Sequence, residues 1–156
     1  MGYDRCWRGL FVAAALFGGA AAPAHAESGA TLVIHVGHVS ARGGMLRLGL
    51  YDVAGYAKDV NPVKAADVPA RAGETVVTLQ DVPPGLYAIE AFQDINGNGE
   101  MDYDWLGLPL EPFGFSRDIR PRFSKPDFAQ VKFTVAAGAQ MQLLHLQDGL
   151  SPLAAD

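Results

Sequence analysis

Apolar and polar residues alternate along the chain in short runs, a pattern typical of β-strands with one buried face. The alternation is clearest at residues 45–51, where Leu46, Leu48 and Leu50 fall on one face. A run of β-branched and apolar residues at 31–36 also favours a strand. Similar runs predict further strands at residues 75–80, 86–93, 130–135 and 140–146.

Turns rich in glycine or proline separate these runs, at residues 42–44, 81–85 and 136–138. No segment keeps a helical period beyond two turns, although short helices are expected at residues 61–67 and 124–129. Six or seven strands linked by hairpin turns predict one all-β domain. We expect a single antiparallel β-sandwich of Ig-like or prealbumin-like type.

Residues 94–129 interrupt this rhythm, because they contain no clear strand. Loops of such length inside a compact domain are usually either functional or disordered. The segment is rich in aromatic residues, among them Trp105 and Phe113, which argues against disorder. We therefore expect a long ordered loop at one end of the sandwich.

The N-terminus has the features of an export signal. Arg5 and Arg8 precede the uncharged apolar run at residues 10–17, and Ala24-His25-Ala26 fits the small-x-small cleavage pattern. The sequence thus predicts that residues 1–26 are a cleaved signal peptide and that the sandwich occupies residues 27–156. A retained N-terminal anchor is the alternative, although the run is short for a membrane span. We expect a periplasmic or secreted protein with no transmembrane segment in the mature chain.

Composition and charge narrow the class of protein. Of the 156 residues, 49% are hydrophobic and only 19% are charged, which excludes an intrinsically disordered chain. Cleavage after Ala26 would leave a net charge of −6, and such a charge argues against a nucleic-acid partner. Cleavage would also remove Cys6, the one cysteine. The mature domain would then have neither a disulfide nor a catalytic cysteine.

Residues 94–102 read D-x-N-x-N-G-x-x-D, the spacing of the first half of an EF-hand loop. In such a loop alternate side chains supply oxygen ligands, a glycine permits the turn, and the seventh residue offers its backbone carbonyl. The pattern predicts one Ca²⁺ ion with weak affinity, held by Asp94, Asn96, Asn98, Glu100 (through its backbone carbonyl) and Asp102.

The loop departs from the EF-hand pattern at its end. Trp105 stands where a bidentate glutamate is expected, so Asp104 or Glu111 would have to complete the ligand set. No helix is predicted on either side. The alternative is a polar hairpin tip, because two Asn-Gly pairs occur here and such pairs are strong turn signals.

Four motifs surround and include this loop. They are Val-Pro-Pro-Gly-Leu-Tyr-Ala-Ile at residues 82–89, Phe-Gln-Asp-Ile-Asn-Gly-Asn-Gly at 92–99, Leu-Gly-Leu-Pro at 106–109 and Glu-Pro-Phe-Gly-Phe-Ser at 111–116. In this order they resemble the bacterial exported family known as domain of unknown function 2141, over about Thr31 to His145. The resemblance implies a small secreted or periplasmic β-sandwich and implies no reaction.

Histidine and serine side chains offer two further candidate sites, and the sequence favours neither. His35 and His38 are three apart, which on a strand places them on opposite faces, so solvent-exposed histidines are favoured over a zinc site. Ser116 lacks a G-x-S-x-G context, which disfavours a serine nucleophile.

The remaining candidates concern ligands. Four basic residues follow the acidic residues of the long loop and are expected to neutralise the net negative charge of the chain, with an anion-binding patch as the alternative: Arg117, Arg120, Arg122 and Lys125. Three loop aromatics are expected to pack on the sandwich, with stacking on a saccharide as the alternative: Trp105, Phe113 and Phe115.

Two classes of function remain open. The favoured one is a non-enzymatic exported module whose calcium-braced loop stabilises the domain or presents a binding surface to a saccharide, an anion or an envelope protein. The alternative is a small hydrolase acting on a sugar or envelope substrate through the loop carboxylates Asp102, Asp104 and Glu111.

Overall fold

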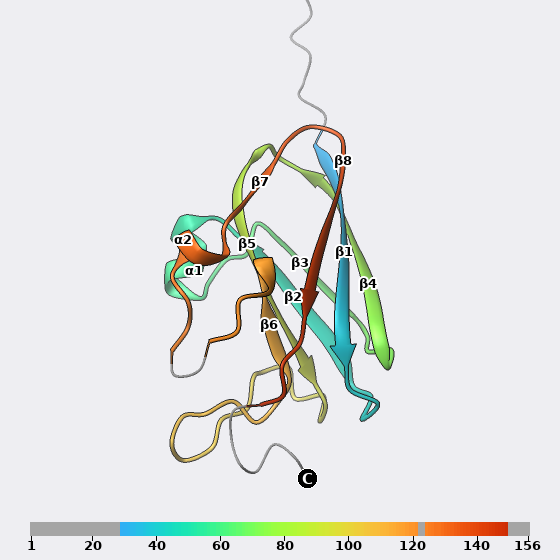
Figure 1. Cartoon of the computed structure of the whole chain (residues 1–156), viewed down its shortest axis with the longest axis vertical. Helices are drawn as coiled ribbons and strands as arrows, with labels where there is room; N and C mark the ends of the chain where they lie inside the picture. Colours follow the sequence, from blue (N-terminus) through green and yellow to red (C-terminus); the bar gives the residue numbers. More distant parts are fainter. Residues whose placement is uncertain (1–28, 122–123, 150–156) are drawn as a thin grey trace, which may run out of the picture.

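A computed structural model describes residues 29–121 and 124–149. The chain forms two β-sheets that pack against each other, as Figure 1 shows. The three-stranded sheet has the order β4 (Gly73–Val82), β1 (Ala30–Val39), β8 (Ala139–His145). The five-stranded sheet has the order β3 (Lys64–Pro69), β2 (Met45–Tyr51), β5 (Gly85–Asp94), with the short strands β6 (Phe113–Phe115) and β7 (Phe133–Val135) both paired with β5. The predicted all-β sandwich is confirmed.

The core lies between the two sheets and follows the predicted alternation. Leu46, Leu48 and Leu50 of β2 point inward and are all but fully buried. They belong to the same buried cluster as Leu32 and Ile34 of β1. Burial of each such side chain stabilises the fold by about 1.5–3 kcal/mol, so this one face of β2 fixes its register.

A second, smaller cluster lies on the outer face of the five-stranded sheet. Here α1 (Val53–Lys58) and α2 (Phe128–Val131) contribute Tyr56 and Val131, which pack with Ala88 of β5. Phe113 and Phe115 of β6 complete the buried set, and Figure 1 shows both helices beside this sheet. The outer face of β5 is therefore covered over much of its length.

The strand connections differ from the predicted hairpins. The turns at residues 42–44, 81–85 and 136–138 each carry the chain from one sheet to the other. As a result β1 pairs with β8, which is distant in sequence, and this pairing is parallel rather than antiparallel. Turn residues mark a change of chain direction, but they do not specify that the flanking strands pair.

The short helices and one strand also differ from expectation. Residues 64–69 form strand β3, which pairs with β2, instead of the helix expected at 61–67. Their side chains alternate between partly buried and exposed positions, as the two faces of a strand require. The helix α1 forms earlier, where Asp52 Oδ1 accepts the Gly55 N–H at 2.8 Å. Likewise α2 begins after Asp127, later than the helix expected at 124–129.

The long segment after β5 is ordered over its described part. Residues 95–112 form loops at the end of the sandwich where β5 ends, as predicted (Figure 1). The segment then returns at the edge of the five-stranded sheet as β6, which pairs with β5 and is a three-residue strand that the sequence pattern did not predict. Among the described residues no helix is long and apolar enough to cross a membrane. The predicted signal peptide lies outside the described residues.

Candidate ligand-binding site

Asp94, the first residue of the acidic loop, is fully buried and saturated with hydrogen bonds. Its Oδ1 accepts the backbone N–H groups of Gly97 at 2.7 Å and Asn98 at 3.2 Å. Its Oδ2 accepts the Gly99 N–H at 2.9 Å and Arg47 Nε at 2.7 Å. Burial alone would raise the pKa of Asp94, but the bonds from Arg47, Gly99 and Gly97 outweigh it and hold the pKa below its ordinary value.

The loop residues that follow bond mainly to one another. The side-chain amides of Asn96 and Asn98 donate to the two carboxylate oxygens of Asp102, at 2.6 and 2.9 Å. Glu100 takes part through its backbone N–H, which donates to Asn98 Oδ1 at 2.9 Å. The structure thus brings together the five residues of the predicted calcium site, in a turn whose polar groups pair internally.

Glu111, one of the two residues expected to complete the calcium ligands, follows residues 94–102 in sequence and holds their backbone by hydrogen bonds. It is only 5% exposed, and its two oxygens accept the backbone N–H groups of Ile95 at 2.7 Å and Asp102 at 3.3 Å. Burial raises the pKa of Glu111, while these two backbone bonds oppose the rise.

This geometry bears on the calcium hypothesis. A carboxylate offers about four lone-pair positions, and in Asp94 all are taken by N–H donors. Asp94 would have to release Arg47 or a backbone donor before it could bind an ion. Among the described residues no three His, Cys, Asp or Glu side chains are grouped to hold a metal. The arrangement favours the hairpin-tip alternative, and calcium binding stays a prediction.

Beyond the acidic turn, residues 102–110 form a hydrogen-bonded hairpin. The backbone N–H groups of Asp104 and Leu110 donate to the carbonyls of Leu108 and Asp102, both at 2.9 Å. Asp104 Oδ1 accepts the N–H groups of Leu106 and Leu108, also at 2.9 Å. Because Glu111 and the Asp94 network anchor its base, this hairpin has a defined position against the sheet.

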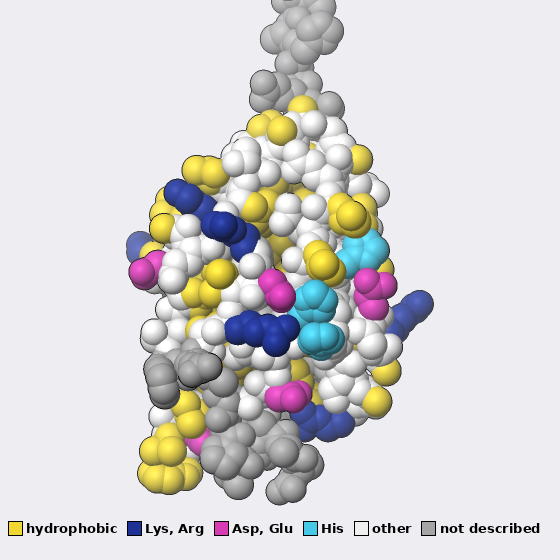
Figure 2. All heavy atoms as spheres, in the orientation of Figure 1, with side chains coloured by type: hydrophobic (Ala, Val, Ile, Leu, Met, Phe, Trp, Pro, Cys, Tyr) yellow, Lys and Arg dark blue, Asp and Glu magenta, His cyan; other side chains and the backbone are white. Residues whose placement is uncertain are grey.

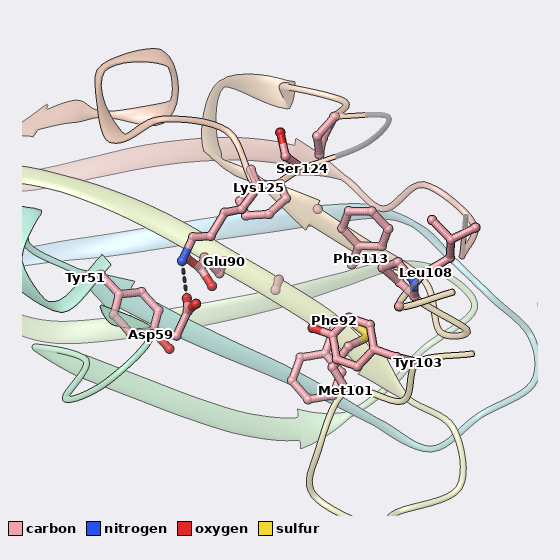
Figure 3. Close-up of a pocket in the computed structure, with 16 residues that line it drawn as sticks. Tyr51, Asp59, Glu90, Phe92, Met101, Tyr103, Leu108, Phe113, Ser124 and Lys125 are labelled. Atoms are coloured by element: carbon pink, nitrogen blue, oxygen red, sulfur yellow. Dashed lines mark hydrogen bonds and ion pairs between the residues drawn. The ribbon is translucent and has the colours of Figure 1, made fainter. Parts of the chain in front are cut away.

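The hairpin forms one wall of a pocket of about 500 Å³ on the outer face of the five-stranded sheet. Figure 3 shows side chains from the sheet, the hairpin and the segment before α2 converging on it. Most of the wall is apolar or aromatic: Phe92, Met101, Tyr103, Leu108, Phe113 and Phe115. Small-molecule pockets typically have roughly 300–1,000 Å³ and mainly apolar walls with a few placed polar groups.

The polar groups gather at one end of the pocket. Lys125 Nζ forms ion pairs with Asp59 and with Glu90, and the three side chains lie together in Figure 3. It also donates to the backbone carbonyl of Tyr56 at 2.8 Å and lies 3.9 Å from the centre of the Tyr56 ring. Burial raises the pKa of Glu90, and the contact with Lys125 offsets only part of this rise.

Sequence reasoning missed the residues of this polar end as a group. Glu90 lies inside the predicted strand 86–93, on the face opposite Ile89. A charged residue within an otherwise apolar strand was the available signal. Its partners Asp59 and Lys125 come from segments that only the tertiary fold brings to it.

The basic residues favour the neutralisation prediction over an anion patch. Arg120 lies 3.9 Å from Asp118, and Lys125 pairs with the two acids named above. Arg117 donates to the Gln130 carbonyl at 3.2 Å. Arg122 lies outside the described residues.

The packing prediction for the loop aromatics holds for two of the three, and stacking on a saccharide stays untested. Phe113 and Phe115 are buried and contact each other edge to face, with ring centres 6.0 Å apart. Trp105 is 85% exposed and does not line the pocket. Packing is therefore correct for the two phenylalanines and incorrect for the tryptophan.

Ser116 has a structural position. It is 1% exposed, accepts the Ile89 N–H at 2.9 Å and donates to the Val131 carbonyl at 2.6 Å. Its hydroxyl thus ties β5 to α2 and is not available as a nucleophile.

The histidines correct one prediction. A β-bulge at His38, where φ is +58°, breaks the alternation of β1 and turns this side chain to the outer face of the three-stranded sheet. There it contacts His145, with ring centres 4.6 Å apart. His145 also contacts Asp118, and His35 contacts Glu74. Figure 2 shows these imidazoles at the surface among acidic side chains. His35 and His38 therefore share a face, against the prediction of opposite faces.

Comparison with protein-family models gives a match over most of the sandwich. The model of the family DUF2141, described as an uncharacterized protein conserved in bacteria, matches residues 34–142. No curated protein and no solved structure matches the chain.

Proposed function

The chain belongs to the DUF2141 family, and for this member we propose an exported, non-enzymatic module that binds a small ligand in the pocket beside the acidic loop. The family match covers most of the sandwich, including the strands and the hairpin that surround the pocket. The signal-like N-terminus supports a periplasmic or secreted location.

The observation that carries this proposal is the pocket itself. Its volume of about 500 Å³ and its aromatic wall suit a drug-sized molecule. The Asp94 turn and Glu111 hold the hairpin wall by backbone hydrogen bonds, which supports a pocket formed before the ligand arrives. A calcium ion would first have to displace one of the Asp94 hydrogen bonds, so the proposal relies on the hydrogen-bonded brace and does not require the ion. The loop's function is then to present the binding surface.

The hydrolase alternative receives no support from the positions of the loop carboxylates. Asp102, Asp104 and Glu111 all accept hydrogen bonds from the loop itself. None of the three lines the pocket. Their geometry suits bracing rather than proton transfer to a substrate.

A fragment screen by thermal shift tests the proposal on residues 27–156. Compounds that raise the melting temperature of the wild-type protein are repeated on Leu108→Trp, which fills the pocket from its hairpin wall. Leu106→Trp is the matched control, because Leu106 lies in the same hairpin, is 58% exposed and does not line the pocket.

We expect compounds that stabilise the wild type and Leu106→Trp but have no effect on Leu108→Trp. Two results would overturn the proposal. One is a screen without any binder. The other is a set of binders that act equally on both variants, since these would bind elsewhere.

A further inference from the structure

The ammonium group at the polar end of the pocket has no donor to spare. Lys125 Nζ lies against three oxygens, those of Asp59, Glu90 and the Tyr56 carbonyl. An ammonium group carries three N–H donors, so these contacts match its full capacity. An anionic ligand would have to displace one of them before Lys125 could bind it.

Lys125 is also held in place by α1. Its contact with the Tyr56 carbonyl satisfies an acceptor in the last turn of that helix, where a positive charge is favourable. The contact with the Tyr56 ring adds a cation–π attraction. Lys125 therefore has a structural role that a ligand would disturb.

The carboxylates leave the pocket with a surplus of negative charge. Asp59, Glu90 and Lys125 are the charged residues that line it, and together they carry one net negative charge when all are ionised. Glu90 Oε1 is buried, and its one charged partner among the described residues is Lys125. This end thus offers acceptors and negative charge rather than donors.

The wall next to these carboxylates is aromatic. Tyr51, Phe92 and Tyr103 line the pocket. In Figure 3 Tyr51 lies beside Asp59, and Phe92 and Tyr103 lie further along the pocket, near Met101. The faces of aromatic rings attract cations, and most strongly where water is excluded. A saccharide would need more polar partners than this largely apolar wall provides.

We propose that the pocket takes a protonated amine attached to an apolar or aromatic body. The ammonium group would lie beside Glu90, and the body would pack among Phe92, Leu108 and Phe113. This inference rests on the proposed function, because it names the class of ligand for the same pocket.

Three probes with one body and different head groups test this inference: phenylbutylamine, phenylbutanol and phenylbutyrate. Their dissociation constants for residues 27–156 are measured by calorimetry at neutral pH and low salt. We expect the amine to bind about tenfold or more tightly than the alcohol, the effect of one modest ionic contact. The carboxylate should bind most weakly.

The charge of Glu90 should account for this preference. In Glu90→Gln the advantage of the amine over the alcohol should fall to about threefold or less. Asp67→Asn is the matched control, because Asp67 also lies on the five-stranded sheet but pairs with Arg47 and does not line the pocket. Should Glu90→Gln fail to fold, Asp59→Asn is the second variant, since Asp59 is 65% exposed and its removal also lowers the negative charge.

The outcomes separate this inference from the proposed function. Equal or tighter binding of the alcohol or the carboxylate would overturn the amine preference and leave a ligand pocket in place. An amine preference unchanged in Glu90→Gln and Asp59→Asn would overturn it as well. If none of the probes binds while fragments still distinguish Leu108→Trp from Leu106→Trp, the amine inference fails alone. If no fragment does so, both proposals fail.

Discussion

Replacing Asp94 with asparagine tests the brace that positions the pocket wall. Asparagine has nearly the same shape, but one carboxylate oxygen becomes an NH₂ group. One of its atoms can still accept the Gly97 N–H, whereas the NH₂ would face the Gly99 N–H and Arg47 Nε. Two donors would then oppose two donors at a fully buried position.

The expected loss follows from those contacts. A hydrogen bond to a charged group contributes about 1.5–3 kcal/mol, and removing one member of a buried pair costs about 3–5 kcal/mol. The Arg47 side chain is 24% exposed and keeps its second partner Asp67, so solvent screening places the estimate at the low end. We expect the free energy of unfolding to fall by about 3 kcal/mol, or the melting temperature by about 10 °C for a domain of this size.

Urea unfolding followed by circular dichroism measures this change. Asp67→Asn is the control and should cost less than about 1 kcal/mol, because it removes an exposed partner of the same arginine. The pKa of Asp94 is lowered, so its ionised form stabilises the fold above its ordinary pKa, and this contribution is lost as pH falls toward the folded-state pKa. The difference between wild type and Asp94→Asn should therefore shrink below about pH 4. A loss of under about 1 kcal/mol, or one independent of pH, would refute the reasoning.

Three other predictions concern stability. Ser116→Ala leaves the buried Ile89 N–H without its partner and should lower the free energy of unfolding by about 1–3 kcal/mol in urea titrations, with a neutral result contradicting the role given to this hydroxyl. Because the pKa of Glu90 is raised, its ionisation disfavours the fold, so the stability of the wild type should decline relative to Glu90→Gln as pH rises above about 4.3; a constant difference would be inconsistent with this. Because backbone N–H groups already occupy the Asp94 oxygens, the hairpin-tip interpretation of residues 94–102 predicts the same melting temperature in calcium and in chelator. A rise of several degrees in calcium, lost in Asp94→Asn, would establish the calcium site instead.

The sandwich was predictable because its core strands show a regular period. Leu46, Leu48 and Leu50 are buried as the alternation of β2 indicates. The sheet order was not predictable, because the turns do not specify which strands become neighbours. The pairing of β1 with β8 joins strands that are distant in sequence, and it is parallel. The bulge at His38 was hidden for a similar reason, because nothing in the local sequence requires a non-glycine residue with positive φ there.

The candidate site was predictable only in its loop. The spacing of Asp94, Asn96, Asn98 and Asp102 correctly indicated that these side chains gather, because a tight turn brings alternate residues together. Their relation to Arg47 was not accessible, since that residue comes from β2, far away in sequence. The pocket was not accessible either, because the residues that line it are far apart in sequence and come together only in the folded chain.

An amide NMR titration of residues 27–156 with phenylbutylamine tests the central claim, a ligand pocket on the outer face of the five-stranded sheet. We predict saturable shifts confined to amides that line the pocket, including those of Glu90, Phe92, Leu108 and Lys125. Amides of the exposed apolar residues Met141 and Leu143, on the other sheet, should not move. Shifts centred on those two residues, or no saturable shifts at all, would contradict the account.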